Sequence, residues 1–164
     1  LMPLEGIEKI VIEGESFEAF NTSGGCATMC ETFENQVENL SYKTIRYPGH
    51  VSHMKFLFND LHLKKNREVL EKLFDKEVPR TKNDVIIFFV KVIGMIDGAL
   101  QEKTYLRKIY GNDKMSAIQL TTASGVCSVL KMHLDGKMKG SGFVKQESLS
   151  WQDFLDNDFG KVYA

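Results

Sequence analysis

The pattern of apolar and polar positions predicts alternating short elements in the first half of the chain. Period-two alternation and β-branched or aromatic enrichment predict three strands, at residues 7–12, 16–21 and 42–47. Apolar residues at helical spacing predict three helices, at residues 26–33, 50–61 and 66–78. Asn66 is placed to cap the last helix. The Gly24-Gly25 and Pro48-Gly49 pairs mark breaks between these elements.

The second half of the chain is dominated by an apolar hairpin and a long helix. Residues 85–93 and 101–110 read as two strands joined at Asp97-Gly98, a strong hairpin signal. Residues 115–134 predict the longest helix, in which Gly125 permits close packing and the expected buried face is Ile118, Thr122, Val126, Val129 and Leu130. A short strand at 142–146 and a last helix capped by Ser150, with Trp151, Phe154 and Leu155 turned inward, complete the pattern.

Strands and helices do not alternate strictly, which favours an α+β architecture over a doubly wound sheet. We expect a mixed, partly antiparallel sheet covered by helices. The 164 residues suit one domain spanning residues 1–164. The hairpin carries more apolar surface than one small core needs, so we expect self-association, most simply a homodimer.

Composition narrows the class of protein. The chain is 43% apolar and 26% charged with a formal net charge of −1, which fits a folded globular protein and offers no basic excess for a nucleic-acid partner. No stretch is apolar enough to span a bilayer, so no membrane partner is expected. Three cysteines, an odd and sparse set, fit a reducing compartment. These features predict a soluble, cytoplasmic protein.

The first candidate binding site follows the second predicted strand, where a helix is expected to begin. A helix N-terminus offers unpaired N–H groups and a partial positive charge, and glycines let a ligand approach the backbone. Such a segment suits a carboxylate or phosphate. It consists of Asn21, Thr22, Ser23, Gly24 and Gly25. An ordinary serine cap with a glycine turn explains the same residues.

The second candidate site surrounds the third predicted strand. Alternation puts Thr44 and Arg46 on one face, and the guanidinium of Arg46 is a rigid fork for a carboxylate. His50 follows the Pro48-Gly49 turn and can titrate near neutral pH. A surface arginine paired with a glutamate and a histidine near a helix end are the structural alternative.

Residues 17–25 and 42–50 together resemble the saccharopine dehydrogenase family, which includes lysine 6-dehydrogenase-like enzymes. The segments Ser116–Ala123 and Gly142–Glu147 extend the similarity over nearly the whole chain. The resemblance implies the C-terminal domain of an oxidoreductase that acts on the CH–NH group of an amino acid, saccharopine or lysine. Asn21 stands where lysine 6-dehydrogenase-like sequences are expected to have histidine, which favours a saccharopine-type substrate.

The resemblance also implies what lies outside this chain. Members of the family begin with a Rossmann domain that binds NAD or NADP, and no Gly-x-Gly-x-x-Gly motif occurs here. We therefore expect a C-terminal substrate-binding and oligomerisation domain of a larger enzyme. Its partners would be its own N-terminal Rossmann domain, an amino-acid substrate and a second subunit. Alone it is expected to bind no cofactor and to be inactive, and no catalytic residue is assigned. The alternative is a non-catalytic binding or oligomerisation module of the same fold.

Overall fold

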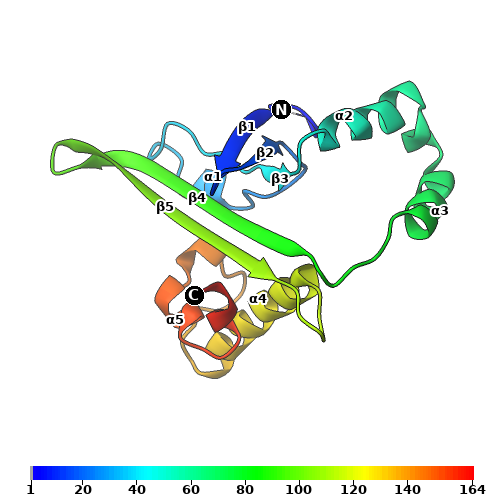
Figure 1. Ribbon diagram of the computed structural model, residues 1–164. Coiled ribbons are helices and arrows are strands. Elements are labelled where there is room, and N and C mark those ends of the chain that lie inside the picture. Colours follow the sequence, from blue (N-terminus) through cyan, green and yellow to red (C-terminus); the bar gives the residue numbers. More distant parts are fainter. Residues whose placement is uncertain (1) are drawn as a thin grey trace. The chain divides into compact units, whose positions relative to one another are not determined.

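A computed structural model describes residues 2–164 (Figure 1). Helices and antiparallel sheets make up the chain, which confirms the α+β class. Where the sequence predicts one domain with one sheet, the structure has two compact units, Leu1–Pro79 and Arg80–Ala164, with one sheet in each. All strand pairs within the described residues are antiparallel.

The first unit is built on a three-stranded sheet in the order β1-β2-β3. Its strands are β1 (Glu8–Ile12), β2 (Glu15–Phe20) and β3 (Thr44–Arg46), each within a residue or two of the predicted range. Glu13 and Gly14 join β1 to β2 with φ of 51° and 82°, the left-handed pair that a tight hairpin requires. The buried apolar residues of this unit are Ile12, Phe17, Ala19, Phe20 and Val51.

Two of the three predicted helices in the first unit are confirmed. The helix predicted at 50–61 is α2 (His50–Lys55), which continues into a π-helical turn at Phe56–Asp60. After a 3-10 turn at Leu63–Lys65, α3 (Arg67–Glu77) begins where Asn66 accepts a hydrogen bond from the Val69 N–H at 3.4 Å. The helix predicted at 26–33 is wrong in extent, because α1 (Met29–Thr32) has only four residues.

A long hairpin opens the second unit. Strands β4 (Val85–Ile96) and β5 (Ala99–Tyr110) pair along twelve residues each, and Asp97 and Gly98 form the turn with φ of 52° and 77°. At its open end, opposite the turn, the hairpin packs against the helices of this unit, whereas the turn end extends beyond them (Figure 1). Val92, Met95 and Leu100 at this end are 62%, 66% and 73% exposed.

The long helix α4 (Ala117–Leu134) is confirmed, but its expected buried face is wrong. Ile118, Val126 and Leu130 are exposed, and the helix packs instead through Ala117, Thr121, Ser124, Ser128 and Met132. Small residues let its axis approach the neighbouring segments closely, and the Thr121 hydroxyl is satisfied within the helix by the Ala117 carbonyl at 2.8 Å. The Asp84 carboxylate accepts the N–H of Ala117 at 2.6 Å, which fixes the start of α4 beneath β4.

The C-terminal segment folds back on α4. The strand predicted at 142–146 is wrong: Gly140 and Gly142 take positive φ, and a 3-10 turn follows at Gln146–Ser148. The last predicted helix is confirmed as α5 (Trp151–Leu155), capped by Ser150 through the Asp153 N–H at 3.2 Å, and a 3-10 turn at Gly160–Tyr163 ends the chain. Among the described residues, no helix has the length and apolarity needed to cross a membrane.

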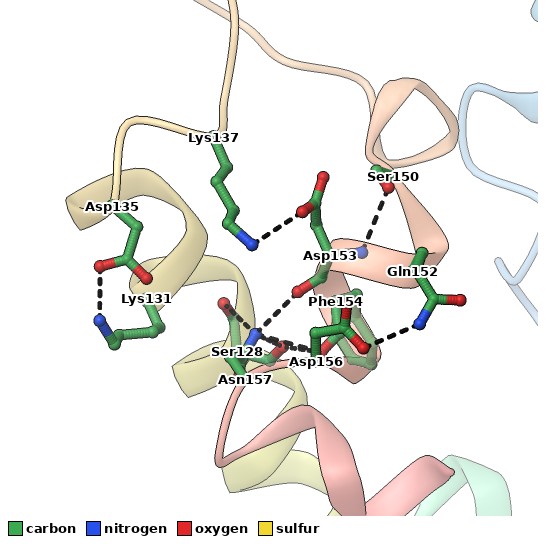
Figure 2. A network of polar contacts seen from close by, with 10 residues as sticks. All are labelled: Ser128, Lys131, Asp135, Lys137, Ser150, Gln152, Asp153, Phe154, Asp156 and Asn157. Atoms are coloured by element: carbon green, nitrogen blue, oxygen red, sulfur yellow. Dashed lines mark hydrogen bonds and ion pairs between the residues drawn. The ribbon is translucent and has the colours of Figure 1, made fainter.

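A polar network ties α4 to α5 (Figure 2). The fully buried Ser128 donates its hydroxyl to the Phe154 carbonyl at 3.0 Å, and the Asn157 amide reaches the Ser128 Oγ at 2.7 Å and the same carbonyl at 3.1 Å. Lys137 and Asp153 form an ion pair at 2.7 Å at the surface of this network. The network holds the backbone of Phe154 in place against the helix.

Candidate functional site

The pairing of β2 with β3 places two of the predicted site residues, Thr44 and Arg46, on one surface. The register sets Glu18 opposite Arg46 and Phe20 opposite Thr44, so these four side chains share a face. Just past the end of β2, the Thr22 hydroxyl lies 3.1 Å from the Thr44 hydroxyl. We call this surface the β2–β3 face; it consists of Glu18, Phe20, Thr22, Thr44, Arg46 and His50.

The Pro48-Gly49 turn carries His50 back to the same face. Gly49 has φ of 97°, a left-handed conformation that glycine adopts without strain. The Glu18 carboxylate accepts the N–H of Gly49 at 3.1 Å and of Val51 at 2.6 Å, so it anchors the start of α2 to the sheet. The rings of His50 and Phe20 then stack, with centroids 5.7 Å apart and planes 20° apart.

The electrostatics of the β2–β3 face set the charge state of His50. Partial burial, and then the nearby positive charge of Arg46, lower the pKa of His50 below its ordinary value, and Glu18 acts in the opposite direction. His50 is therefore neutral at neutral pH and offers one donor and one acceptor. In that state it can orient a ligand by hydrogen bonding without adding charge.

Arg46 is the positive charge that this face presents to solvent. Its side chain is exposed, and its Nη1 donates to the carbonyl of Ile45 at 2.9 Å. It takes part in none of the ion pairs found among residues 2–164. Although Glu18 lies opposite in the register, its two oxygens are engaged by the Gly49 and Val51 amides. The guanidinium fork remains available for a carboxylate from outside.

The expected helix N-terminus at Ser23, Gly24 and Gly25 is not formed. The first helix begins only at Met29, after Gly24, Gly25 and Ala27 have all taken positive φ. A run of left-handed residues cannot continue into a helical turn, so the amides of this loop do not converge as a helix end. Gly25 instead makes room for an aromatic ring: a Cβ there would lie 2.1 Å from Cδ1 of Tyr42.

Asn21 is placed apart from the β2–β3 face. Strand alternation puts it on the side of Phe17 and Ala19, and its backbone pairs with the N-terminal segment through Leu4 and Glu5. The residue is only 9% exposed, and its Nδ2 has no hydrogen-bond partner among the described residues. It belongs to the buried side of the sheet rather than to the surface that carries Arg46.

Sequence reasoning missed two residues of this site. Glu18 anchors the turn and Phe20 supports His50, yet neither was a candidate. Alternation already placed both on one side of their strand. The sequence did not show which strand pairs with β2. Only the antiparallel pairing of β2 with β3 brings Glu18 and Phe20 beside Arg46 and Thr44.

Comparisons with known proteins leave the family open. No protein-family model matches the chain, and no solved structure matches it significantly. The sequence resemblance of residues 17–25, 42–50, 116–123 and 142–147 to saccharopine dehydrogenases stays a prediction.

Proposed function

We propose that this chain is the substrate-binding part of a saccharopine dehydrogenase-like oxidoreductase and that the β2–β3 face binds a carboxylate of the amino-acid substrate. The observation that carries the proposal is the exposed Arg46 guanidinium, without a carboxylate partner among the described residues, on the same face as a hydroxyl pair and a neutral imidazole. The family resemblance supplies the substrate class, because saccharopine-type substrates carry several carboxylates and an amine.

Each group on this face has a distinct part in binding. Arg46 supplies charge and a bidentate geometry that matches a carboxylate. Thr22 and Thr44 supply hydroxyl donors 3.1 Å apart, either of which can turn from its neighbour to a ligand oxygen. His50, fixed by its stack on Phe20, adds a hydrogen bond without adding charge. Together they orient one end of a substrate.

The nicotinamide cofactor is assigned to another part of the enzyme. The family resemblance implies that NAD or NADP is bound by a Rossmann domain, a parallel βαβ unit with a glycine-rich loop, and the strand pairs among the described residues are all antiparallel. The donor set of the β2–β3 face suits a carboxylate and not a dinucleotide. No proton-transfer or hydride-transfer role is given to a residue of this chain.

The test replaces the Arg46 guanidinium by a group that keeps the positive charge. In the full-length enzyme, Arg46→Lys is expected to raise KM for saccharopine by about tenfold or more, because lysine cannot make the bidentate bond. The KM for the cofactor should stay unchanged. The matched control is Arg67→Lys, which alters an exposed arginine of the same unit that pairs with Glu71 at 2.6 Å.

Stability measured on the same preparations distinguishes a substrate-binding role of Arg46 from a purely structural one. If Arg46 only holds two elements together, Arg46→Lys lowers the melting temperature and leaves the KM for saccharopine at the wild-type value. That pair of results would refute the proposed function. If the intact enzyme oxidised neither saccharopine nor lysine, that result would refute the family assignment.

A further inference from the structure

The second unit contains an aromatic pocket that the proposed function does not use. The pocket has a volume of about 480 Å³, within the range of about 300–1,000 Å³ typical of small-molecule sites. One face of the hairpin forms one wall and the C-terminal segment forms the other. Its lining residues are Phe88, Val90, Tyr105, Trp151, Phe154 and Tyr163.

The rings that line this pocket contact one another in the geometries that aromatic pairs prefer. Trp151 stacks on Phe154 with centroids 5.2 Å apart and planes 12° apart, and Tyr105 meets Trp151 edge-on at 5.8 Å and 90°. Phe88 and Tyr163 are tilted at 5.3 Å. The open pocket therefore presents ring faces and edges, which suit a flat apolar group.

The two tyrosine hydroxyls of the lining are already engaged. The Tyr163 hydroxyl donates to the Thr121 carbonyl at 2.6 Å, and the Tyr105 hydroxyl donates to the Tyr163 carbonyl. Both hydroxyl hydrogens are thus used inside the protein. The lining itself offers an occupant no free hydroxyl hydrogen.

The wall formed by α5 is fixed before any ligand arrives. The Phe154 carbonyl accepts hydrogen bonds from Ser128 at 3.0 Å and from Asn157 at 3.1 Å (Figure 2). Asn157 also accepts the Gly160 N–H at 3.1 Å, which secures the turn that carries Tyr163. A preformed wall lowers the entropic cost of binding.

One cation stands beside the pocket. Arg107 lies opposite Phe88 in the β4–β5 register, and its guanidinium is 5.6 Å from the centroid of the Tyr105 ring. Both neighbours line the pocket. Arg107 is exposed, donates to the Leu106 carbonyl at 3.5 Å and joins none of the ion pairs found in the described part of the chain. Burial raises the pKa of Tyr105, and the positive charge of Arg107 partly opposes that rise.

We propose that this pocket binds an aromatic carboxylate, with the ring between Trp151 and Phe88 and the carboxylate against Arg107. The aromatic lining selects a flat apolar ring, and the guanidinium selects an anion over a neutral or cationic ligand. The pocket lies wholly within Arg80–Ala164, so this site is separate from the β2–β3 face of the first unit.

The single tryptophan of the chain reports directly on this site. Trp151 lines the pocket and is the only tryptophan in the sequence, so its fluorescence changes arise there. Titration with 2-naphthoate is expected to quench it saturably. Naphthalene-2-carboxamide, which has the same rings without the charge, should bind about tenfold more weakly because it loses the charge-assisted bond to Arg107.

Two variants test separately the binding of the carboxylate and the binding of the aromatic ring. Arg107→Gln should weaken 2-naphthoate about tenfold and leave the carboxamide unaffected. Val90→Phe should fill the pocket and abolish binding of both compounds. Val90 is 52% exposed, so the larger side chain is accommodated without disturbing a core, and far-ultraviolet circular dichroism checks the fold. Lys103→Gln, which removes another cation from the same strand, is the matched control and should bind as the wild type.

The outcomes decide the proposal. Absence of saturable quenching by 2-naphthoate would overturn it. Equal affinity for naphthoate and carboxamide, or wild-type affinity in Arg107→Gln, would overturn the assignment of an anion. Unchanged binding in a folded Val90→Phe variant would place the ligand elsewhere on the protein.

Discussion

Gly160 is the residue at which a single methyl group should cost most. A Cβ there would lie 1.6 Å from the Phe154 carbonyl oxygen and 3.0 Å from the Ser128 hydroxyl, both members of the network that joins α4 to α5. The backbone at Gly160 is not left-handed, so the penalty comes from space alone. Gly160→Ala should destabilise the second unit by about 1–3 kcal/mol, measured by denaturant unfolding.

Gly94 provides the control for that substitution. It lies in β4 of the same unit, its φ is not positive, and a Cβ there would meet nothing within 4 Å. Gly94→Ala should therefore leave the stability unchanged or slightly raised, because alanine reduces the entropy of the unfolded chain. Equal losses in the two variants would contradict the steric explanation.

His50 should make the stability of the first unit depend on pH. Its pKa in the folded protein is lowered from the ordinary 6.5, first by burial and then by Arg46. As pH falls through the ordinary range of histidine, the unfolded chain binds the proton before the folded chain does, so stability falls. The loss begins near the unfolded pKa and is complete below the folded pKa. Above the ordinary value, His50 has no effect on the pH dependence.

Replacing His50 by phenylalanine isolates this contribution. His50→Phe keeps a ring stacked on Phe20 but cannot titrate, so the fall in melting temperature between neutral and mildly acidic pH should shrink. The comparison variant is His62→Asn, which removes an exposed histidine where φ is 54°, a conformation that asparagine tolerates. A His50→Phe profile parallel to that of the wild type would show that His50 does not titrate differently on folding.

At the scale of elements, the hairpin leaves large apolar side chains uncovered by the rest of its own unit. An isolated two-stranded sheet is marginal in water, and Val92, Met95 and Leu100 near its turn are all more than 60% exposed. Strand β4 carries one charge, Lys91, whereas β5 carries several, so β4 is the edge with the weaker protection against pairing. We expect the chain to self-associate through this edge.

A charge placed on β4 should reverse that association. Val92→Lys is expected to shift the sedimentation of the chain towards the monomer without altering its far-ultraviolet spectrum. Val11→Lys makes the same change at a 70% exposed valine in β1, in the other unit, and should leave the oligomeric state as it is. A wild-type chain that stays monomeric at high concentration would contradict the expectation.

Local signals predicted the elements well, and non-local packing explains the errors. The hairpin at Asp97-Gly98 and the helix caps at Asn66 and Ser150 follow from neighbouring residues. The buried face of α4 could not be predicted in the same way. Its most apolar stripe, through Ile118 and Val126, is exposed because the close approach of the C-terminal segment requires small side chains instead.

The same division holds for the candidate site. Alternation and the Pro48-Gly49 turn were enough to group Thr44, Arg46 and His50. At the loop from Ser23 to Gly25, the expected helix start was wrong, because sequence alone does not show that Gly24, Gly25 and Ala27 take positive φ. The ring of Tyr42 lies beside Gly25 there. The aromatic pocket escaped notice since its lining comes from three separate segments.

For the whole molecule, the division into two compact units predicts two separable functions. The β2–β3 face lies in Leu1–Pro79 and the aromatic pocket in Arg80–Ala164, and each unit has its own sheet and its own buried residues. Unfolding monitored by circular dichroism should therefore show two transitions. Units that share few contacts across their boundary tend to unfold as separate cooperative units. Tryptophan fluorescence should follow only one of them, since Trp151 belongs to the second unit.

Gly160→Ala and His50→Phe assign each transition to its unit. The first variant should lower the transition that Trp151 reports and leave the other in place, while the second should change only the transition that the fluorescence does not see. Saturating 2-naphthoate should raise the midpoint of the Trp151 transition alone, because a ligand stabilises the unit that binds it. A single transition seen identically by both probes, and moved as a whole by either variant, would show that the two units fold as one cooperative body.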